Sequence, residues 1–263
     1  MTDNHEIDVS TLRAQLVEWK QGVRSESLFW DQWMQERGGQ WPQDFQSRFN
    51  PETPLDPWIA AAVRDLSKKE VSILDVGCGP VPIIGYKLEG VALSITAVDP
   101  LAMIYNSLLT RHGLHPPVAP TFAPAEELGS FFERNSFDII HCRNALDHSF
   151  DPLRGISEML KVARPGGLIL LRHHRNEAER EKYSGFHHYN FDCRDDRFLI
   201  WNKAISVDIS DFLAGQAQVS GVFRNYVDVT IQKIHDNFSP PEANRHRLRQ
   251  YLQAFVEVIA SIG

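Results

Sequence analysis

The sequence predicts an α/β fold, and two patterns carry that prediction. Between residues 71 and 172, short apolar runs alternate with stretches of helical spacing, which is typical of a parallel sheet covered on both faces. An acid and two glycines follow the first apolar run, which is typical of a ligand-binding turn at the carboxyl end of a strand. The chain has 263 residues, 43% of them hydrophobic, enough for one large core.

Residues 1–65 are expected to form an N-terminal helical cap on the substrate side. Five of the six tryptophans fall in this segment. Such aromatic side chains either anchor helices to a core or wall a substrate pocket. The sequence leaves both interpretations open.

Residues 66–263 are expected to form the core domain, with a substrate-side insertion at 175–215. The expected strands are 71–76, 93–98, 121–123, 137–142 and 167–172, with helices at 81–88, 102–112, 126–133 and 152–162 between them. The later elements are a hairpin of residues 198–202 and 204–209, antiparallel strands at 218–223 and 226–234, and an amphipathic helix at 241–261.

Composition argues against several classes of protein. The net charge of −7 lacks the basic footprint that binding to a phosphate backbone needs, so we expect no nucleic-acid partner. No run approaches the ~18 apolar residues of a membrane span, and the first residues lack an apolar signal segment. We therefore expect a cytoplasmic protein without a membrane span.

The cysteines predict neither a disulfide framework nor a zinc knuckle. Cys78, Cys142 and Cys193 are odd in number, and none is paired at CxxC spacing. We expect reduced thiols.

The stretch Leu74–Pro80 reads LDVGCGP and marks the turn after the first strand. Gly77 and Gly79 can adopt positive φ and let a ligand approach the backbone closely. A dinucleotide fingerprint needs a third glycine at position 82, which is Pro82 in this chain. Asp75 would repel a pyrophosphate and attract a cationic ligand, so the turn favours a different nucleoside.

These residues resemble the first motif of class I S-adenosylmethionine-dependent methyltransferases, in particular the type 11-like small-molecule group. The resemblance covers about residues 71–172, and its longest match is the strand, loop, helix and RPGG turn from Ser136 to Leu171. It implies a Rossmann-like seven-stranded methyltransferase sheet, with strand 7 antiparallel. It also implies S-adenosylmethionine as the cofactor.

The resemblance assigns cofactor-binding residues at four strand ends. Asp99, 20 residues after Gly79, is at the spacing of an acid that accepts ribose hydroxyls. The implied set is Asp75, Gly77, Cys78, Gly79, Asp99, Pro100, Ala125, Glu126, Cys142 and Arg143. The chain departs from the family at Val81, where a glycine is usual, and at Pro124, where an acid is usual.

A hydroxyl acceptor needs a base, and histidine suits neutral pH. His148 is the candidate, with Asp147 or Asp151 as its orienting partner, and Asn144 faces the exit of the methyl group by analogy. The alternative is that His148 transfers no proton.

The remaining histidines and arginines can each be interpreted in two ways. Residues 181–192 form either a substrate-side loop or a plain connection. Arg143, Arg172 and Arg175 either bind an anionic substrate, or are solvated or paired with Glu177 and Glu179. No metal site is predicted, because adjacent histidines diverge and a site needs three or four converging ligands.

The sequence thus predicts methyl transfer to a small-molecule or glycan-type acceptor, most simply on oxygen. One rival is a non-catalytic protein that binds S-adenosylmethionine and serves as a regulator or partner. Another is an NAD-dependent oxidoreductase. The acceptor and the oligomeric state stay open, because one fold serves many acceptors.

Overall fold

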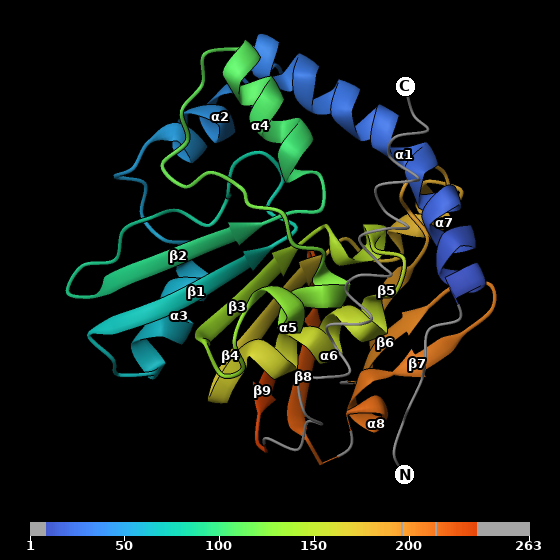
Figure 1. Cartoon of the computed structure of the whole chain (residues 1–263). Helices are drawn as coiled ribbons and strands as arrows, with labels where there is room; N and C mark the ends of the chain where they lie inside the picture. Colours follow the sequence, from blue (N-terminus) through green and yellow to red (C-terminus); the bar gives the residue numbers. More distant parts are fainter. Residues whose placement is uncertain (1–8, 196, 214, 236–263) are drawn as a thin grey trace.

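A six-stranded sheet forms the centre of the protein, with the strand order β2-β1-β3-β4-β9-β8 (Figure 1). The computed structural model describes residues 9–235, apart from 196 and 214. The strands of this sheet are β1 (Glu70–Val76), β2 (Ala92–Val98), β3 (Phe137–Arg143), β4 (Ala163–His173), β8 (Ala217–Phe223) and β9 (Val227–Lys233).

The sheet is parallel except for β9. The first four strands pair in parallel, whereas β9 runs antiparallel to both β4 and β8. The expected strand 121–123 is reduced to one parallel bridge between Val98 and Thr121. The Rossmann-like fold class and its antiparallel strand, now β9, are confirmed. In the described residues the sheet has six strands rather than the expected seven, because the segment 121–123 forms only this bridge.

Alternate residues of the central strands face two different layers. Val71 and Ile73 pack with α3 (Pro57–Asp65) on one face. Leu74 and Val76 pack on the other face, which α5 (Leu128–Phe131) and α6 (Pro152–Val162) cover. Strands buried on both faces explain the nearly continuous apolar runs in the sequence.

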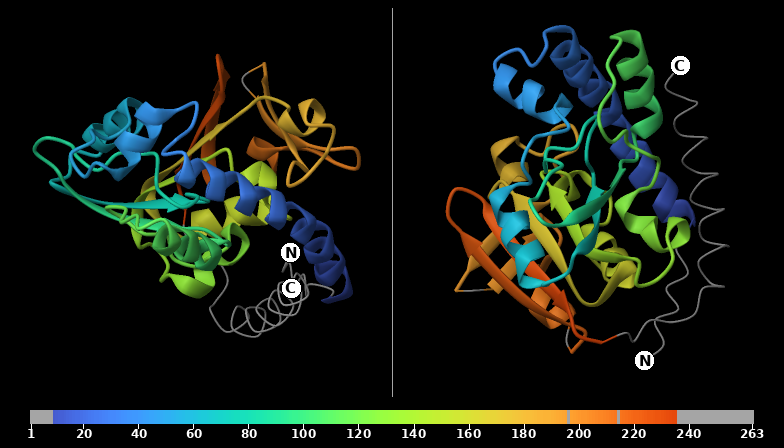
Figure 2. Two further views of the ribbon diagram at one scale, coloured as in Figure 1. Left: turned by 90° about the horizontal axis from the view of Figure 1, so that it is seen from above. Right: turned by 90° about the vertical axis from the view of Figure 1, so that its left-hand side faces the viewer.

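Two N-terminal helices and α4 form a separate aromatic core. Helix α1 (Val9–Gln35) runs from beside the C-terminal half of the chain to α2 (Pro42–Phe49) and α4 (Ala102–Arg111), as Figures 1 and 2 show. Trp33 and Phe45 pack together there, with ring centroids 5.0 Å apart. In the described part of the chain, no helix has the length and apolar character to cross a membrane.

A small antiparallel sheet follows β4. It has the order β5-β6-β7 and extends the core that lies on the α6 side. The expected hairpin is present as its last two strands, and the first was not expected. Its elements are α7 (Glu177–Arg180), β5 (Asn190–Arg194), β6 (Arg197–Trp201), β7 (Ser206–Asp208) and α8 (Ile209–Phe212).

The helix expected at 81–88 is wrong, because this segment is a loop. Pro80 and Pro82 have no N–H to donate, and the loop bonds instead to residues 53–56, as in the 2.7 Å bond from the Asp56 N–H to the Ile84 carbonyl. Gly85 has φ +79°, and a Cβ there would lie 2.0 Å from the Pro54 carbonyl oxygen.

Two further helices were expected, at 126–133 and at 241–261. The helix expected at 126–133 is a 3-10 turn, η1 (Ala125–Glu127), followed by α5. The helix expected at 241–261 lies outside the described residues. The proposed boundaries of the cap at 1–65, the core at 66–263 and the insertion at 175–215 remain predictions.

Candidate functional site

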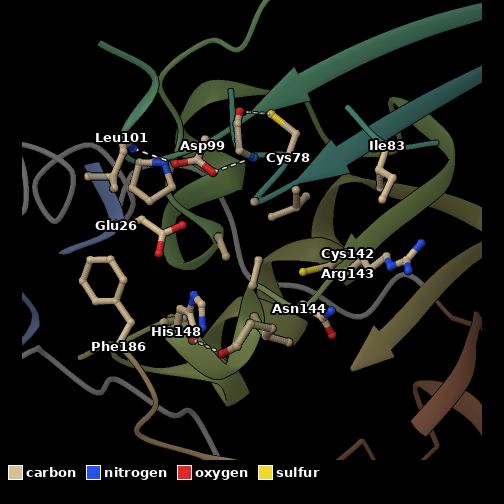
Figure 3. Close-up of a pocket in the computed structure, with 18 of the residues that line it drawn as sticks. Glu26, Cys78, Ile83, Asp99, Leu101, Cys142, Arg143, Asn144, His148 and Phe186 are labelled. Carbon is tan, nitrogen blue, oxygen red and sulfur yellow. Dashed lines mark hydrogen bonds between the residues drawn. The ribbon is translucent and has the colours of Figure 1, made fainter. Parts of the chain in front are cut away.

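A cavity of about 760 Å³ opens at the carboxyl ends of β1, β2 and β3. Helix α1 closes one side of it, and Figure 3 shows Glu26 and Phe186 across the cavity from Cys142 and Arg143. All ten residues that the sequence assigned to the cofactor line it. Asn144 and His148 line it too, while Asp147 lies behind them, 2% exposed.

The glycine turn after β1 forms the floor of the cavity. Gly77 and Gly79 have φ of +67° and +64°, as expected for this turn. A Cβ on Gly77 would lie 2.3 Å from the Ala145 side chain, and one on Gly79 would lie 3.2 Å from the Trp30 ring. Packing thus requires glycine at position 77 and makes position 79 tight, and the positive φ favours glycine at both.

Asp75 presents one buried oxygen without a partner. Its Oδ1 lies 2.7 Å from Nδ1 of the buried His141. Its Oδ2 has no hydrogen-bond partner among the described residues. A buried carboxylate oxygen that nothing satisfies is costly, and a donor in the cavity would satisfy it.

Asp99 holds the backbone of two loops. Its Oδ2 accepts the Gly79 N–H at 3.0 Å, and its Oδ1 accepts the Leu101 N–H at 2.8 Å. Burial raises the pKa of Asp99 to about 7, and the nearby carboxylates of Glu26 and Asp75 act in the same direction. Each oxygen keeps a further lone pair for a ligand hydroxyl.

Glu126 supports the loop that follows β3. Its Oε1 accepts the N–H groups of Phe150 and Asp151, at 3.1 and 3.3 Å. Burial raises the pKa of Glu126 to about 8. Pro124 and Ala125 line the cavity beside it. At position 124, where the family usually has an acid, the cavity is therefore lined by an apolar ring.

The end of β3 places three expected residues at the opposite wall (Figure 3). The Cys142 thiol is buried, and that burial raises its pKa well above the usual value. The Arg143 guanidinium lies 5.4 Å from the Tyr226 ring centroid. Asn144 has φ +45°, and its Oδ1 accepts the His174 N–H at 3.1 Å.

Two of the arginines proposed for an anionic substrate are paired, but with aspartates rather than with the expected Glu177 and Glu179. Arg172 makes a forked contact with Asp228, with N–O distances of 2.6 and 3.3 Å. Arg175 does the same with Asp192, at 2.6 and 3.3 Å. Arg143 has no ion pair with any described residue.

Three side chains converge beside the cavity, and we call Asp147, His148 and His187 the histidine cluster. His148 Nε2 lies 3.2 Å from His187 Nδ1 and 3.3 Å from Asp147 Oδ2. His187 Nδ1 is also 3.3 Å from that oxygen. Asp151 is not part of this group, because it caps α6 by accepting the Arg154 N–H.

The charge of Asp147 is stabilised by its neighbours. Burial alone would raise the pKa of Asp147, but interactions with His148, His173 and His187 outweigh burial and hold that pKa far below its usual range. Burial opposes a charge on His187, yet Asp147 raises the pKa of this histidine overall.

The site and the fold match a known domain. Residues 74–171 match the family model described as "Methyltransferase domain". The chain contains a class I S-adenosylmethionine-dependent methyltransferase domain.

Curated relatives align with slightly less than half of this chain. A ubiquinone biosynthesis O-methyltransferase of Bordetella bronchiseptica is 30% identical over 132 residues, which cover 48% of this chain and 53% of the relative. A probable chloroplastic tocopherol O-methyltransferase of Oryza sativa subsp. japonica is 30% identical over 116 residues, covering 43% and 32%. The chain therefore spans about half the length, or less, of these relatives.

Among solved structures, a S-adenosylmethionine-dependent methyltransferase from Clostridium acetobutylicum is similar to this chain. It is 14% identical, with a TM-score of 0.43, over 68% of this chain and 89% of that one.

The unpartnered oxygen of Asp75 is suited to the cofactor of the methyltransferase domain. S-adenosylmethionine carries an ammonium and a sulfonium, and Asp75 Oδ2 is a buried acceptor on the wall of the cavity. Glu26 lines the same cavity, and its carboxylate makes the cavity more favourable for a cation.

The methyltransferase cavity also contains residues outside the assigned cofactor and catalytic set, most of them from segments that the sequence offered as possible substrate-side walls. Glu26, Phe186 and His187 line it from α1 and from the connection before β5. Trp19, Trp30, Trp33 and Trp41 line it as well, so four of the five early tryptophans face the cavity. Trp58 instead lies under Arg172, 4.8 Å from the guanidinium. Glu26 was not expected there, and its carboxylate accepts the Trp30 indole N–H at 2.7 Å.

Proposed function

We propose that this chain transfers a methyl group from S-adenosylmethionine to an oxygen of a small molecule. The observation that supports this most is the shared cavity, which the glycine turn, Asp75 and Asp99 line together with His148 and His187 of the histidine cluster. The curated relatives named O-methyltransferases support oxygen as the acceptor atom.

The residues of the first motif would hold the cofactor. Asp75 Oδ2 would accept from its ammonium, Asp99 would accept from the ribose hydroxyls, and Ala125 would border the adenine. When bound, the cofactor supplies a methyl group on a positively charged sulfur, which keeps the bonding electron pair when the acceptor oxygen takes the methyl. The protein contributes mainly alignment and the exclusion of water.

The acceptor would lie between the histidine cluster and the rings of Trp19 and Phe186, which we call the aromatic wall. Trp19 and Phe186 stack at 5.0 Å beside His148, and flat apolar surfaces of this kind fit an aromatic ring or the C–H face of a sugar. Arg143, which forms no ion pair within the described part of the chain, would attract an acidic group on the acceptor.

The acceptor hydroxyl would lose its proton at His148. Asp147 and His187 contact Nε2 of this imidazole, which leaves Nδ1 to accept a proton. Asp147 would orient the ring and stabilise its positive charge, as a carboxylate does for a histidine base. Asn144 would position the loop end through its bond to residue 174.

Calorimetry with S-adenosylmethionine, S-adenosylhomocysteine and NAD tests the cofactor. We expect saturable binding of the first two and none of NAD. The rival assignment to an oxidoreductase would require the reverse.

Radiolabelled S-adenosylmethionine incubated with fractionated small molecules then tests transfer. We expect label in a small-molecule fraction and formation of S-adenosylhomocysteine. Cofactor binding without transfer to any fraction would favour the rival, a non-catalytic binding protein.

A further inference from the structure

We propose that the histidine cluster binds one first-row divalent transition-metal ion. Asp147 Oδ2, His148 Nε2 and His187 Nδ1 form a nearly equilateral triangle with edges of 3.2 to 3.3 Å. Each is an atom type that ligates metals, and all three lie within 4.8 Å of one another. No local sequence pattern indicates this site, because His187 is 39 positions from His148.

The triangle has the dimensions of a coordination site. A point equidistant from three atoms at these separations lies about 1.9 Å from each, and a small displacement from their plane gives the ~2.0–2.1 Å of zinc–imidazole bonds. Separations near 3.3 Å are also those between ligands of a tetrahedral ion with bonds of about 2.0 Å.

Hydrogen bonds can occupy at most two edges of this triangle. Asp147 is ionised, so only His148 Nε2 and His187 Nδ1 can carry a proton. Each such N–H can point along only one edge of the triangle. Whichever tautomers are present, one edge joins two lone pairs or two N–H groups. A cation accepts all three lone pairs together, so it engages all three atoms at once.

Neighbouring groups hold the ligands in place. The buried His173 places its Nδ1 3.5 Å from Asp147 Oδ1, a charge contact rather than a hydrogen bond. The His148 and His187 rings are nearly perpendicular, with centroids 4.6 Å apart. The Trp19 indole N–H bonds to the His148 carbonyl oxygen at 3.0 Å and fixes that end of the loop. Such supporting contacts are typical of metal ligands.

The proposed ion would keep an open side. His148 and His187 line the cavity, whereas Asp147 lies beneath them. Three protein ligands with a free position on the cavity describe a catalytic rather than a structural site. Two imidazole donors favour zinc, iron, cobalt or nickel over magnesium and calcium, which prefer oxygen ligands.

The role of the ion rests on the proposed function. An acceptor hydroxyl bound at the open position would lose its proton more readily, because a divalent cation lowers the pKa of a bound oxygen. The O–H bond breaks, its electron pair stays on oxygen and the proton leaves to water. With the ion in place, this replaces proton transfer to His148.

Titration of the chelator-treated full chain with Co²⁺ and Zn²⁺, without cofactor, tests the site. We expect one equivalent bound per chain by calorimetry, visible d–d absorption from Co²⁺, and no comparable binding of Mg²⁺. His187→Gln removes one ligand and should weaken binding by at least about tenfold.

The matched control is His174→Gln. His174 also lines the cavity, but its ring packs against the Tyr226 ring, with centroids 4.9 Å apart, and is not part of the histidine cluster. This variant should therefore bind Co²⁺ as the natural chain does. Circular dichroism verifies that both variants fold.

Failure to bind one equivalent of either ion below about millimolar concentration would overturn the proposal. So would equal weakening by the two variants. Calorimetry with S-adenosylmethionine on the same samples separates the two proposals: cofactor binding without metal binding removes only the metal site, and metal binding without cofactor binding removes only the proposed function.

Discussion

The two sides of the cavity are held together in different ways. On the cofactor side, the turns after β1, β2 and β3 meet because parallel strands end at the same edge of a sheet. On the other side, α1 and the connection before β5 meet through aromatic packing between distant residues, such as Trp19 on Phe186. The first side follows from a repeating pattern, whereas the second depends on individual contacts.

The two sides are nevertheless interlocked at the glycine turn. Trp30 from α1 lies against Gly79, and residues 53–56 form the hydrogen bonds that a helix after β1 would otherwise have made internally. The N-terminal segment thus takes over part of the structural role of that helix. Changes at the turn should therefore affect both sides.

Gly77→Ala should have the largest effect on this interlocked turn. It places a Cβ 2.3 Å from the Ala145 side chain at φ +67°, and strain plus overpacking should lower the free energy of unfolding by about 2–4 kcal/mol. Gly90→Ala is the control, since its φ of +77° is similar but nothing lies within 4 Å. It should cost only ~1 kcal/mol. Urea denaturation measures both, and equal losses would contradict the packing argument.

Asp75→Asn should separate cofactor binding from folding. The amide can still bond to His141, but the charge facing the cavity is lost. Affinity for S-adenosylmethionine should fall by about 10- to 100-fold, the value of a charge-assisted hydrogen bond. Glu70→Gln, at the exposed start of the same strand, should leave affinity unchanged. Calorimetry that found no difference between the two variants would remove Asp75 from the cofactor site.

How far the sequence could predict the site also differs between the two sides. The apolar runs located β1 to β4, and the topology of a parallel sheet then brought Asp75 and Asp99 to one cavity. The helix after β1 was predicted wrongly, because its hydrogen-bond partners are residues 53–56 rather than its own turns. His187 could not be placed, because no local pattern links it to Asp147 across 40 positions.

The pH dependence of cofactor binding should show whether Asp99 binds the cofactor in its ionised form. Its pKa is about 7 in the protein, so the carboxyl is largely protonated at pH 6 and ionised at pH 8. Only the ionised form offers all of its lone pairs to ribose hydroxyls, so affinity should rise about tenfold from pH 6 to pH 8. In Asp99→Asn this position does not titrate, and that component of the pH dependence should disappear. An unchanged pH profile in the variant would exclude Asp99 as its source.

The smallest effect we expect is at Phe186, on the side built from distant contacts. Phe186→Leu keeps apolar volume but removes the stacking on Trp19 and the contact with the His148 ring. An aromatic pair contributes about 0.5–1.5 kcal/mol, so the KM for the acceptor should rise about 2- to 12-fold while the Kd for S-adenosylmethionine stays within about twofold. Phe131→Leu removes a comparable ring contact, with Phe122, away from the cavity lining, and should change neither constant. If Phe186→Leu instead weakens the cofactor and leaves KM unchanged, then Phe186 belongs to the cofactor side, and the aromatic wall is not where the acceptor binds.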